Sequence, residues 1–436
     1  MLVLDFEGQP SSVVVSAPTG VAARNIQGTT IHRAFKLPVE RGRLGKFKPL
    51  EGETLQAFRE QYKRLKSVII DEIRMIPAET LNFINKRLGQ LQRKEREDTS
   101  DGNEGKPFGG LSVLLFGDLL QLKPVNGHWI FDQYSVAEPY LWKKFQFHEL
   151  RLNVRQRGDP KMLELCNCIR DGSIEEHPVI RQILIDNSLD NLNPEDFHEA
   201  IRIVPTNALA SNYNEMKLEE LQAERQTLIN QGRITGKPIY VLQAKDTHMD
   251  RQRFVAPVEG KFIPSDTNKT GVPTRLGIAP GVRIMLRRNL DISKGLVNGA
   301  MGIITSINWG QFRKDQLYEG DLPESVEVNF ACAGKHNIRP LTIEFDGNRK
   351  TKIKRTMLPC ILCWAITAHK TQGMTIPKAV IDIGKRNFAH GQIYVAISRV
   401  HTRGIGHTKL HCRQINKKVL SGSTLPIPTR NTPRRY

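Results

Sequence analysis

Short apolar runs separated by helical stretches organise the first part of the chain. The β-branched run at residues 12–15 leads into a Pro-Thr-Gly loop, and the apolar runs at residues 67–70 and 111–116 end in polar or glycine residues. Helical stretches, such as residues 21–26 and 78–93, lie between these runs. Runs that are apolar throughout are typical of strands buried on both faces of a parallel sheet. The pattern predicts an α/β domain with its chemistry at the carboxyl ends of the strands.

A second α/β unit is predicted later in the chain. A strand at residues 201–205 is followed by a helical stretch at residues 207–225, and further strands are expected at residues 282–286 and 379–382. Residues 298–358 have a different sequence pattern from the α/β units, with glycines and short runs of alternating apolar and polar residues. That pattern predicts a small β-barrel inserted into the second unit.

Composition is that of a soluble globular protein, with 39% hydrophobic and 25% charged residues in a chain of 436, long enough for two or more domains. No apolar run approaches the roughly 18 residues of a membrane helix, and we expect no secretory signal.

Six cysteines do not suggest a disulfide framework. Cys360 and Cys363 have the spacing of half a zinc site without a second pair, which favours buried thiols in a reducing compartment.

The net charge of +19 points to a polyanionic partner, usually nucleic acid. A solvated basic surface without a ligand is the alternative. No acidic residue follows Asp382, and the last two basic residues are Arg434 and Arg435. We expect the stretch at 421–433 to be disordered and the basic tail to add sequence-independent contacts to phosphates.

Polar side chains follow two of the predicted strands. Asp71 and Glu72 directly follow the run at 67–70. The Asp71 carboxylate could hold Mg²⁺ through water, and the Glu72 carboxylate could accept a proton from a water that attacks a γ-phosphate. Asp118 and Gln121 follow the next run, and a glutamine there can sense the γ-phosphate. Solvated acids and an ordinary turn are the alternatives.

Cationic and aromatic residues form a second group of candidates. Arg155 and Arg399 could stabilise the charge that grows during phosphoryl transfer, although each alone is more often a surface charge. His32, Phe35 and the segment at 367–370 combine rings, hydroxyls and cations, as single-stranded nucleic acid requires. The alternative is a core histidine and a packed phenylalanine.

Six segments, in this order, resemble the motifs of the petite-integration-frequency (Pif) helicase family, the 5′→3′ branch of superfamily one. The segments are residues 17–32 (motif Ia), 71–72 (II), 117–121 (III), 154–156 (IV), 367–373 (V) and 394–399 (VI).

The resemblance implies two RecD-like α/β domains of the P-loop NTPase type, with ATP between them and single-stranded DNA across both. The β insertion resembles the family's SH3-like subdomain. The expected domains are 1–150 (first RecD-like domain), 151–297 and 359–412 (second RecD-like domain), 298–358 (β insertion) and 413–436 (disordered tail).

The resemblance also implies roles for individual residues. Asp71 would be the magnesium acid, Glu72 the base, Gln121 the sensor, and Arg155 and Arg399 the arginine fingers. Nucleotide-binding residues would also include Asp118 and Gly373. The residues expected to contact DNA are Pro18, Thr19, His32, Phe35, His369, Lys370 and Gln372.

The implied activity is ATP-dependent 5′→3′ DNA unwinding in repair, recombination or telomere maintenance, with Mg²⁺ and ATP as cofactors. Implied partners are single-stranded DNA and DNA junctions, bound by a monomer without membrane attachment. The implied location is intracellular, in the nucleus or mitochondrion of a eukaryote.

The chain departs from the family at the phosphate loop. Residues 1–436 contain no Gly-x-x-x-x-Gly-Lys-Ser/Thr, and the nearest approach, at 232–237, has the wrong glycine spacing. The family places this loop ahead of the strand at Ser12, so the first domain is expected to be truncated and the chain as given to be inactive. Arg74 and Lys123 replace a usual serine and proline. The rival functions are a non-catalytic single-stranded-DNA-binding remnant of a helicase or mobile element, and a non-hydrolytic scaffold subunit.

Overall fold

The computed structural model of the chain describes two compact units. The described residues are 12–40, 43–92, 106–122, 124, 129–131, 140–150, 152–156, 158–186, 200–250, 253–255, 272–310, 321–331, 333–346, 352–376, 378–382, 391–400 and 408–411. Unit 1 comprises residues 1–118, 123–146 and 214–364, and unit 2 comprises residues 119–122, 147–213 and 365–436. The expected tail at 413–436 and Lys123 lie outside the described residues.

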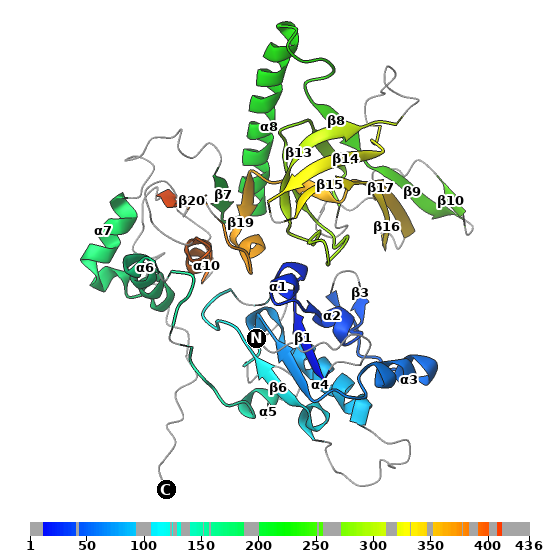
Figure 1. Ribbon diagram of the computed structural model, residues 1–436, viewed down its shortest axis with the longest axis vertical. Coiled ribbons are helices and arrows are strands. Elements are labelled where there is room, and N and C mark those ends of the chain that lie inside the picture. The colour runs from blue at the N-terminus through cyan, green and yellow to red at the C-terminus, as the bar shows by residue number, and fades with distance from the viewer. Residues whose placement is uncertain are drawn as a thin grey trace. The chain divides into compact units, whose positions relative to one another are not determined.

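The parallel sheet of unit 1 is built from the three apolar runs that the sequence indicated. Its order is β2-β1-β5-β6, and every neighbouring pair is parallel (Figure 1). The bounds are β1 Val13–Ala17, β2 Thr29–Thr30, β5 Ser67–Ile70 and β6 Ser112–Leu115. The prediction of a parallel α/β sheet is confirmed. Because the strands run the same way, the segments that follow β1, β5 and β6 meet at one edge.

Helices surround this sheet. Their bounds are α1 Gly20–Asn25, α2 Ile31–Ala34, α3 Gly52–Gln61, α4 Ala78–Gln92 and α5 Tyr140–Lys143, with 3₁₀ turns η1 Ile73–Met75 and η2 Pro107–Gly110. A small hairpin joins β3 Val39–Glu40 to β4 Arg43–Leu44. The apolar residues of α4 recur at helical spacing, and Leu81, Ile84 and Leu88 are buried as this spacing requires.

The strands in the rest of unit 1 form antiparallel sheets. A five-stranded sheet has the order β15-β14-β13-β12-β18, a four-stranded sheet has the order β10-β9-β17-β16, and β11 pairs with β8. The bounds are β8 Tyr240–Gln243, β9 Lys245–Asp250, β10 Arg253–Val255, β11 Arg275–Ile278, β12 Arg283–Leu286, β13 Met301–Asn308, β14 Ser325–Phe330, β15 Gly334–Ile338, β16 Leu341–Asp346, β17 Lys352–Met357 and β18 Cys360–Leu362.

The structure corrects the predicted position of one strand. The strand expected at residues 282–286 in the second α/β domain is β12, and it pairs antiparallel with β13 and β18. The β-rich part therefore begins well before residue 298. Short apolar strands look alike in parallel and antiparallel sheets, so the run itself did not reveal its partners.

Unit 2 contains the second parallel sheet, in the order β19-β7-β20-β21. Its strands are β7 Ile201–Val204, β19 Ala365–Thr367, β20 Ala379–Asp382 and β21 Thr408–His411, and its helical elements are α6 Pro160–Asp171, η3 Ile174–Glu176, α7 Pro178–Asp186, η8 Ala368–Thr371 and α10 Gln392–Ser398. Apolar residues of α6, α7, β7, β20 and α10 form one core. The long helix α8, Asn207–Asn230, follows β7 as expected; its residues 207–213 belong to unit 2 and its residues 214–230 to unit 1.

Buried cysteines are part of both units. Cys166, Cys168, Cys360 and Cys363 are buried free thiols, and burial raises the pKa of Cys360 to about 12. Within the described ranges, no helix is both long and apolar enough to cross a membrane.

Candidate functional site

Two polar segments are held side by side at the carboxyl edge of the unit 1 sheet. After β5, the amide of Ile73 donates to the carbonyl of Phe116 (2.9 Å), and the amide of Phe116 donates to the carbonyl of Ile70 (2.8 Å). These bonds fix the Asp71–Glu72 segment next to the Gly117–Asp118 segment. The structure therefore places the predicted carboxylates Asp71, Glu72 and Asp118 on neighbouring strand ends of one sheet.

The backbone conformation of Glu72 and the pKa of Asp71 both depart from their ordinary values. Glu72 has a left-handed backbone (φ 51°), which a non-glycine residue rarely adopts and which occurs often at functional sites. Burial raises the pKa of the Asp71 carboxyl, while a hydrogen bond from the Glu72 backbone opposes that shift. Among the described residues, no group of three His, Cys, Asp or Glu side chains is placed to hold a metal.

Arg74 links the same two segments. Its Nη1 donates to the carbonyl of Asp118 (3.4 Å), and its guanidinium lies 4.6 Å from the ring centroid of Trp129, a cation–π contact. Arg74 is buried. The sequence marked Arg74 as a departure from the family but gave no signal that Trp129 would cover it.

Arg155 and Arg399, which are far apart in sequence, meet at one residue of unit 2. Arg155 Nη1 donates to the carbonyl of Ser398 (3.2 Å), and Arg399 Nη2 donates to the Ser398 hydroxyl (3.0 Å). Gln156 Nε2 donates to the carbonyls of Ser398 and Val400 (3.4 and 3.0 Å). Arg399 is only 2% exposed, and its Nε donates to the carbonyl of its α10 neighbour four residues earlier. Arg399 would have to exchange these bonds to reach a ligand.

Gln121 lies near the N-terminal end of α10, and Arg399 follows its C-terminal end. Gly391, the residue before the helix, has a left-handed backbone (φ 81°), and a Cβ there would lie 3.1 Å from the Leu120 oxygen and the Gln121 carbonyl carbon. Glycine thus permits a close backbone approach that a side chain would prevent. Gln121 and Arg399 consequently lie at opposite ends of one seven-residue helix.

The segment around η8 is tied to α10 and α8. His369 Nδ1 lies 3.1 Å from Gln392 Nε2, and burial lowers the pKa of His369. Lys370 Nζ donates to Asn207 Oδ1 (3.4 Å). Gln372 is buried, and Gly373 follows with a left-handed backbone. Sequence reasoning missed Asn207 and Gln392, whose amide side chains gave no motif signal.

The predicted DNA contacts of unit 1 separate into partly exposed and buried residues. Pro18 and Thr19 are partly exposed, and the Thr19 hydroxyl caps α1 by accepting from the amide of Ala22 (3.2 Å). His32 is partly exposed, and burial lowers its pKa.

Phe35 corrects the sequence-based hypothesis. Its side chain is 0% exposed, so it cannot stack on a base in this conformation. The reason lies in α2, which buries Ile31 and Ala34 together with the cap residue Phe35. A phenylalanine three positions after a histidine gives the same sequence pattern in a nucleic-acid-binding motif and in a hydrophobic core. Only the observed packing shows which of these two roles the ring has.

Comparison with known proteins gives consistent results. Residues 1–177 match the family described as PIF1-like helicase, and residues 268–307 match the DNA helicase Pif1, 2B domain. The ATP-dependent DNA helicase PIF1 of Xenopus laevis is 29% identical over 396 residues, covering 89% of this chain and 53% of the relative. The human protein of the same name is 28% identical over 401 residues, covering 90% and 53%. The chain thus spans about half the length of the curated relatives it matches.

Solved structures show the same fold. A Pif1 helicase from Candida albicans has a TM-score of 0.63 at 24% identity, covering 94% of this chain and 86% of that chain. A Bacteroides Pif1 bound to ssDNA has a TM-score of 0.65 at 23% identity, covering 94% and 84%. The chain is therefore similar to PIF1-like helicases in its first 177 residues and in residues 268–307.

Proposed function

We propose that this chain forms the motor core of an ATP-dependent helicase that moves 5′→3′ on single-stranded DNA. The observation that carries the proposal is the set of six ordered motifs, in a chain whose residues 1–177 match the PIF1-like helicase model. The proposed setting is intracellular and reducing, in the nucleus or mitochondrion if the organism is eukaryotic, and the proposed active form is a monomer.

The carboxylates of unit 1 suit a magnesium–nucleotide complex. Carboxylate oxygens are the ligands that Mg²⁺ prefers. Because burial raises the pKa of Asp71, its ionised form is disfavoured there, and a divalent cation would offset that effect. We assign Asp71, assisted by Asp118, to holding Mg²⁺, which would neutralise charge on the phosphates. Glu72 is assigned the proton of the attacking water.

The remaining roles belong to unit 2. The paired guanidiniums of Arg155 and Arg399 are proposed to stabilise the charge of the transferred phosphoryl group. Gln121 and Gly373 are proposed to respond to the nucleotide. His369, Lys370 and Gln372 are proposed to contact DNA, with the His369–Gln392 contact connecting them to the helix that ends at Arg399.

Single-stranded DNA binding without sequence preference is the first expected result. Affinity for a poly-dT oligonucleotide, measured by fluorescence anisotropy, should fall at least about tenfold between roughly 50 and 200 mM salt, because bound cations release counterions from the DNA. Lys370→Ala should weaken binding. Lys217→Ala should have little effect, since this lysine of α8 is paired with Glu220. Absence of binding, or binding indifferent to salt, would contradict the proposal.

A further inference from the structure

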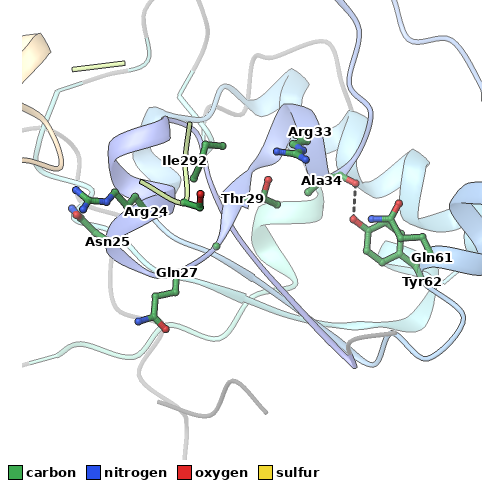
Figure 2. A pocket seen from close by; sticks show the side chains of 11 residues that line it. Arg24, Asn25, Gln27, Thr29, Arg33, Ala34, Gln61, Tyr62 and Ile292 are labelled. Atoms are coloured by element: carbon green, nitrogen blue, oxygen red, sulfur yellow. Dashed lines mark hydrogen bonds between the residues drawn. The ribbon is translucent and has the colours of Figure 1, made fainter. Parts of the chain in front are cut away.

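A pocket on unit 1 lies beside the segment that carries Thr19 and His32, and neither of these two residues lines it. Its volume is about 870 Å³, and it opens between the ends of α1 and α2, the Gln61–Tyr62 turn and a loop at residues 292–293 (Figure 2). The polar side chains that line it include Arg24, Asn25, Gln27, Thr29, Arg33 and Gln61.

The charge of the pocket is positive. Two arginines line it, and none of its lining residues carries a carboxylate. The nearest acid in sequence to its loop is Asp291. That carboxylate accepts from the Ser293 hydroxyl (2.5 Å) and forms an ion pair with Lys294 (3.5 Å), so local donors already offset its charge. The pocket therefore favours an anion.

The walls of the pocket are fixed by packing. Gly295 has a left-handed backbone (φ 78°), and a Cβ there would lie 2.4 Å from Cζ of Arg24, so the missing side chain makes room for the guanidinium. The Tyr62 hydroxyl donates to the carbonyl of Ala34 (2.9 Å), which ties the α3 end to α2, as the dashed line in Figure 2 shows. Arg33 is exposed on α2 and reaches the pocket from the side of Thr29.

We propose that this pocket binds a backbone phosphate of the DNA held by the chain. Guanidinium groups offer two parallel donors to phosphate oxygens, and hydroxyl and amide side chains commonly complete such contacts. The pocket is large enough for the attached sugar as well. Thr19 caps one end of α1 and Arg24 lies five residues later in its last turn, so the two backbone positions are separated by roughly 7.5 Å along the helix axis. The pocket would hold a phosphate farther along the DNA from Thr19.

This inference rests on the proposed function, since it takes DNA as the ligand. The test compares Arg33→Ala and Arg33→Lys with the parent chain, using anisotropy on a poly-dT oligonucleotide and on a forked duplex at several salt concentrations. Lys63→Ala is the matched control: Lys63 is an exposed cation next to Tyr62, pairs with Glu60, and does not line the pocket. Melting temperatures of all variants should match, because Arg33 is exposed.

Arg33→Ala should weaken DNA binding about five- to tenfold and reduce the salt slope by roughly one ion. Arg33→Lys should keep the slope and lose part of the affinity, since an ammonium lacks the paired donors. Lys63→Ala should change affinity less than about twofold. A loss on both DNAs identifies a phosphate of the single strand, and a loss on the fork alone identifies one of the duplex arm. If the parent binds DNA and Arg33→Ala behaves like Lys63→Ala, the pocket assignment is wrong. If the parent binds no DNA, the proposed function fails as well.

Discussion

DNA-stimulated ATP hydrolysis should appear when a phosphate-loop segment is joined ahead of Ser12, and should be absent from a polypeptide of residues 1–436 alone. The loop supplies backbone donors, a lysine on the β- and γ-phosphates and a hydroxyl for Mg²⁺, and residues 1–436 contain no such motif. Without it, Asp71 and Glu72 have no positioned substrate. Because positioning dominates phosphoryl-transfer catalysis, the two proteins should differ by many orders of magnitude in rate.

The first sheet can accept such a segment. Among the described strands, β6 pairs only with β5. Leu114 within β6 and Phe116 just after it are 45% and 41% exposed. A joined strand–glycine-rich loop–Lys-Thr–helix segment from a family member could therefore extend the sheet. Phosphate release would be measured with and without DNA.

Glu72→Gln in the joined protein is the control for this experiment, and it should abolish hydrolysis while leaving DNA binding intact. Glu72-dependent turnover by residues 1–436 alone would contradict the argument. A joined protein that folds, binds DNA and stays inactive would favour the non-catalytic DNA-binding alternative. Arg74, which contacts the Asp118 carbonyl and Trp129, would then be the first residue to revert to serine.

Phe35→Ala should destabilise unit 1 by about 3–5 kcal/mol, since it removes a fully buried ring and leaves a cavity. The surrounding packing is anchored by Arg87, which is buried and whose Nε donates to the Phe35 carbonyl (3.0 Å). Thermal unfolding should show a midpoint lower by roughly 10 °C. Phe35→Leu should lose much less stability because it keeps most of the apolar volume.

DNA affinity separates this account of Phe35 from base stacking. Under conditions where Phe35→Ala remains folded, its affinity for single-stranded DNA should equal that of the unsubstituted chain. An unchanged unfolding midpoint together with about 1–3 kcal/mol of lost DNA binding would instead mean that the ring stacks on a base.

The sequence predicted those parts of the fold and site that depend on local pattern. The runs at residues 67–70 and 379–382 were placed correctly because strands buried on both faces are continuously apolar. Asp71 and Asp118 could be expected at one edge because parallel strands end together. Both inferences need only the chain's own periodicity.

What the sequence could not predict depends on packing between distant segments. Arg155 and Arg399 both contact Ser398, which is adjacent to Arg399 but 243 positions from Arg155. No periodic pattern in the sequence predicts such a contact. The antiparallel pairing of β12 and the burial of Phe35 are similar, since partner choice and side-chain exposure are decided by tertiary contacts. The cover that Trp129 provides for Arg74 likewise follows from the fold.

Polarity of strand separation tests the central claim most directly. The phosphate-loop-joined protein would be given duplexes with a single-stranded tail at either the 5′ or the 3′ end, and release of a labelled strand would be followed with and without ATP. A 5′→3′ helicase should separate the 5′-tailed duplex only with ATP, should leave the 3′-tailed duplex intact, and should lose this activity with Glu72→Gln. Equal separation of both duplexes, or DNA-stimulated ATP hydrolysis that separates neither, would contradict the proposed function.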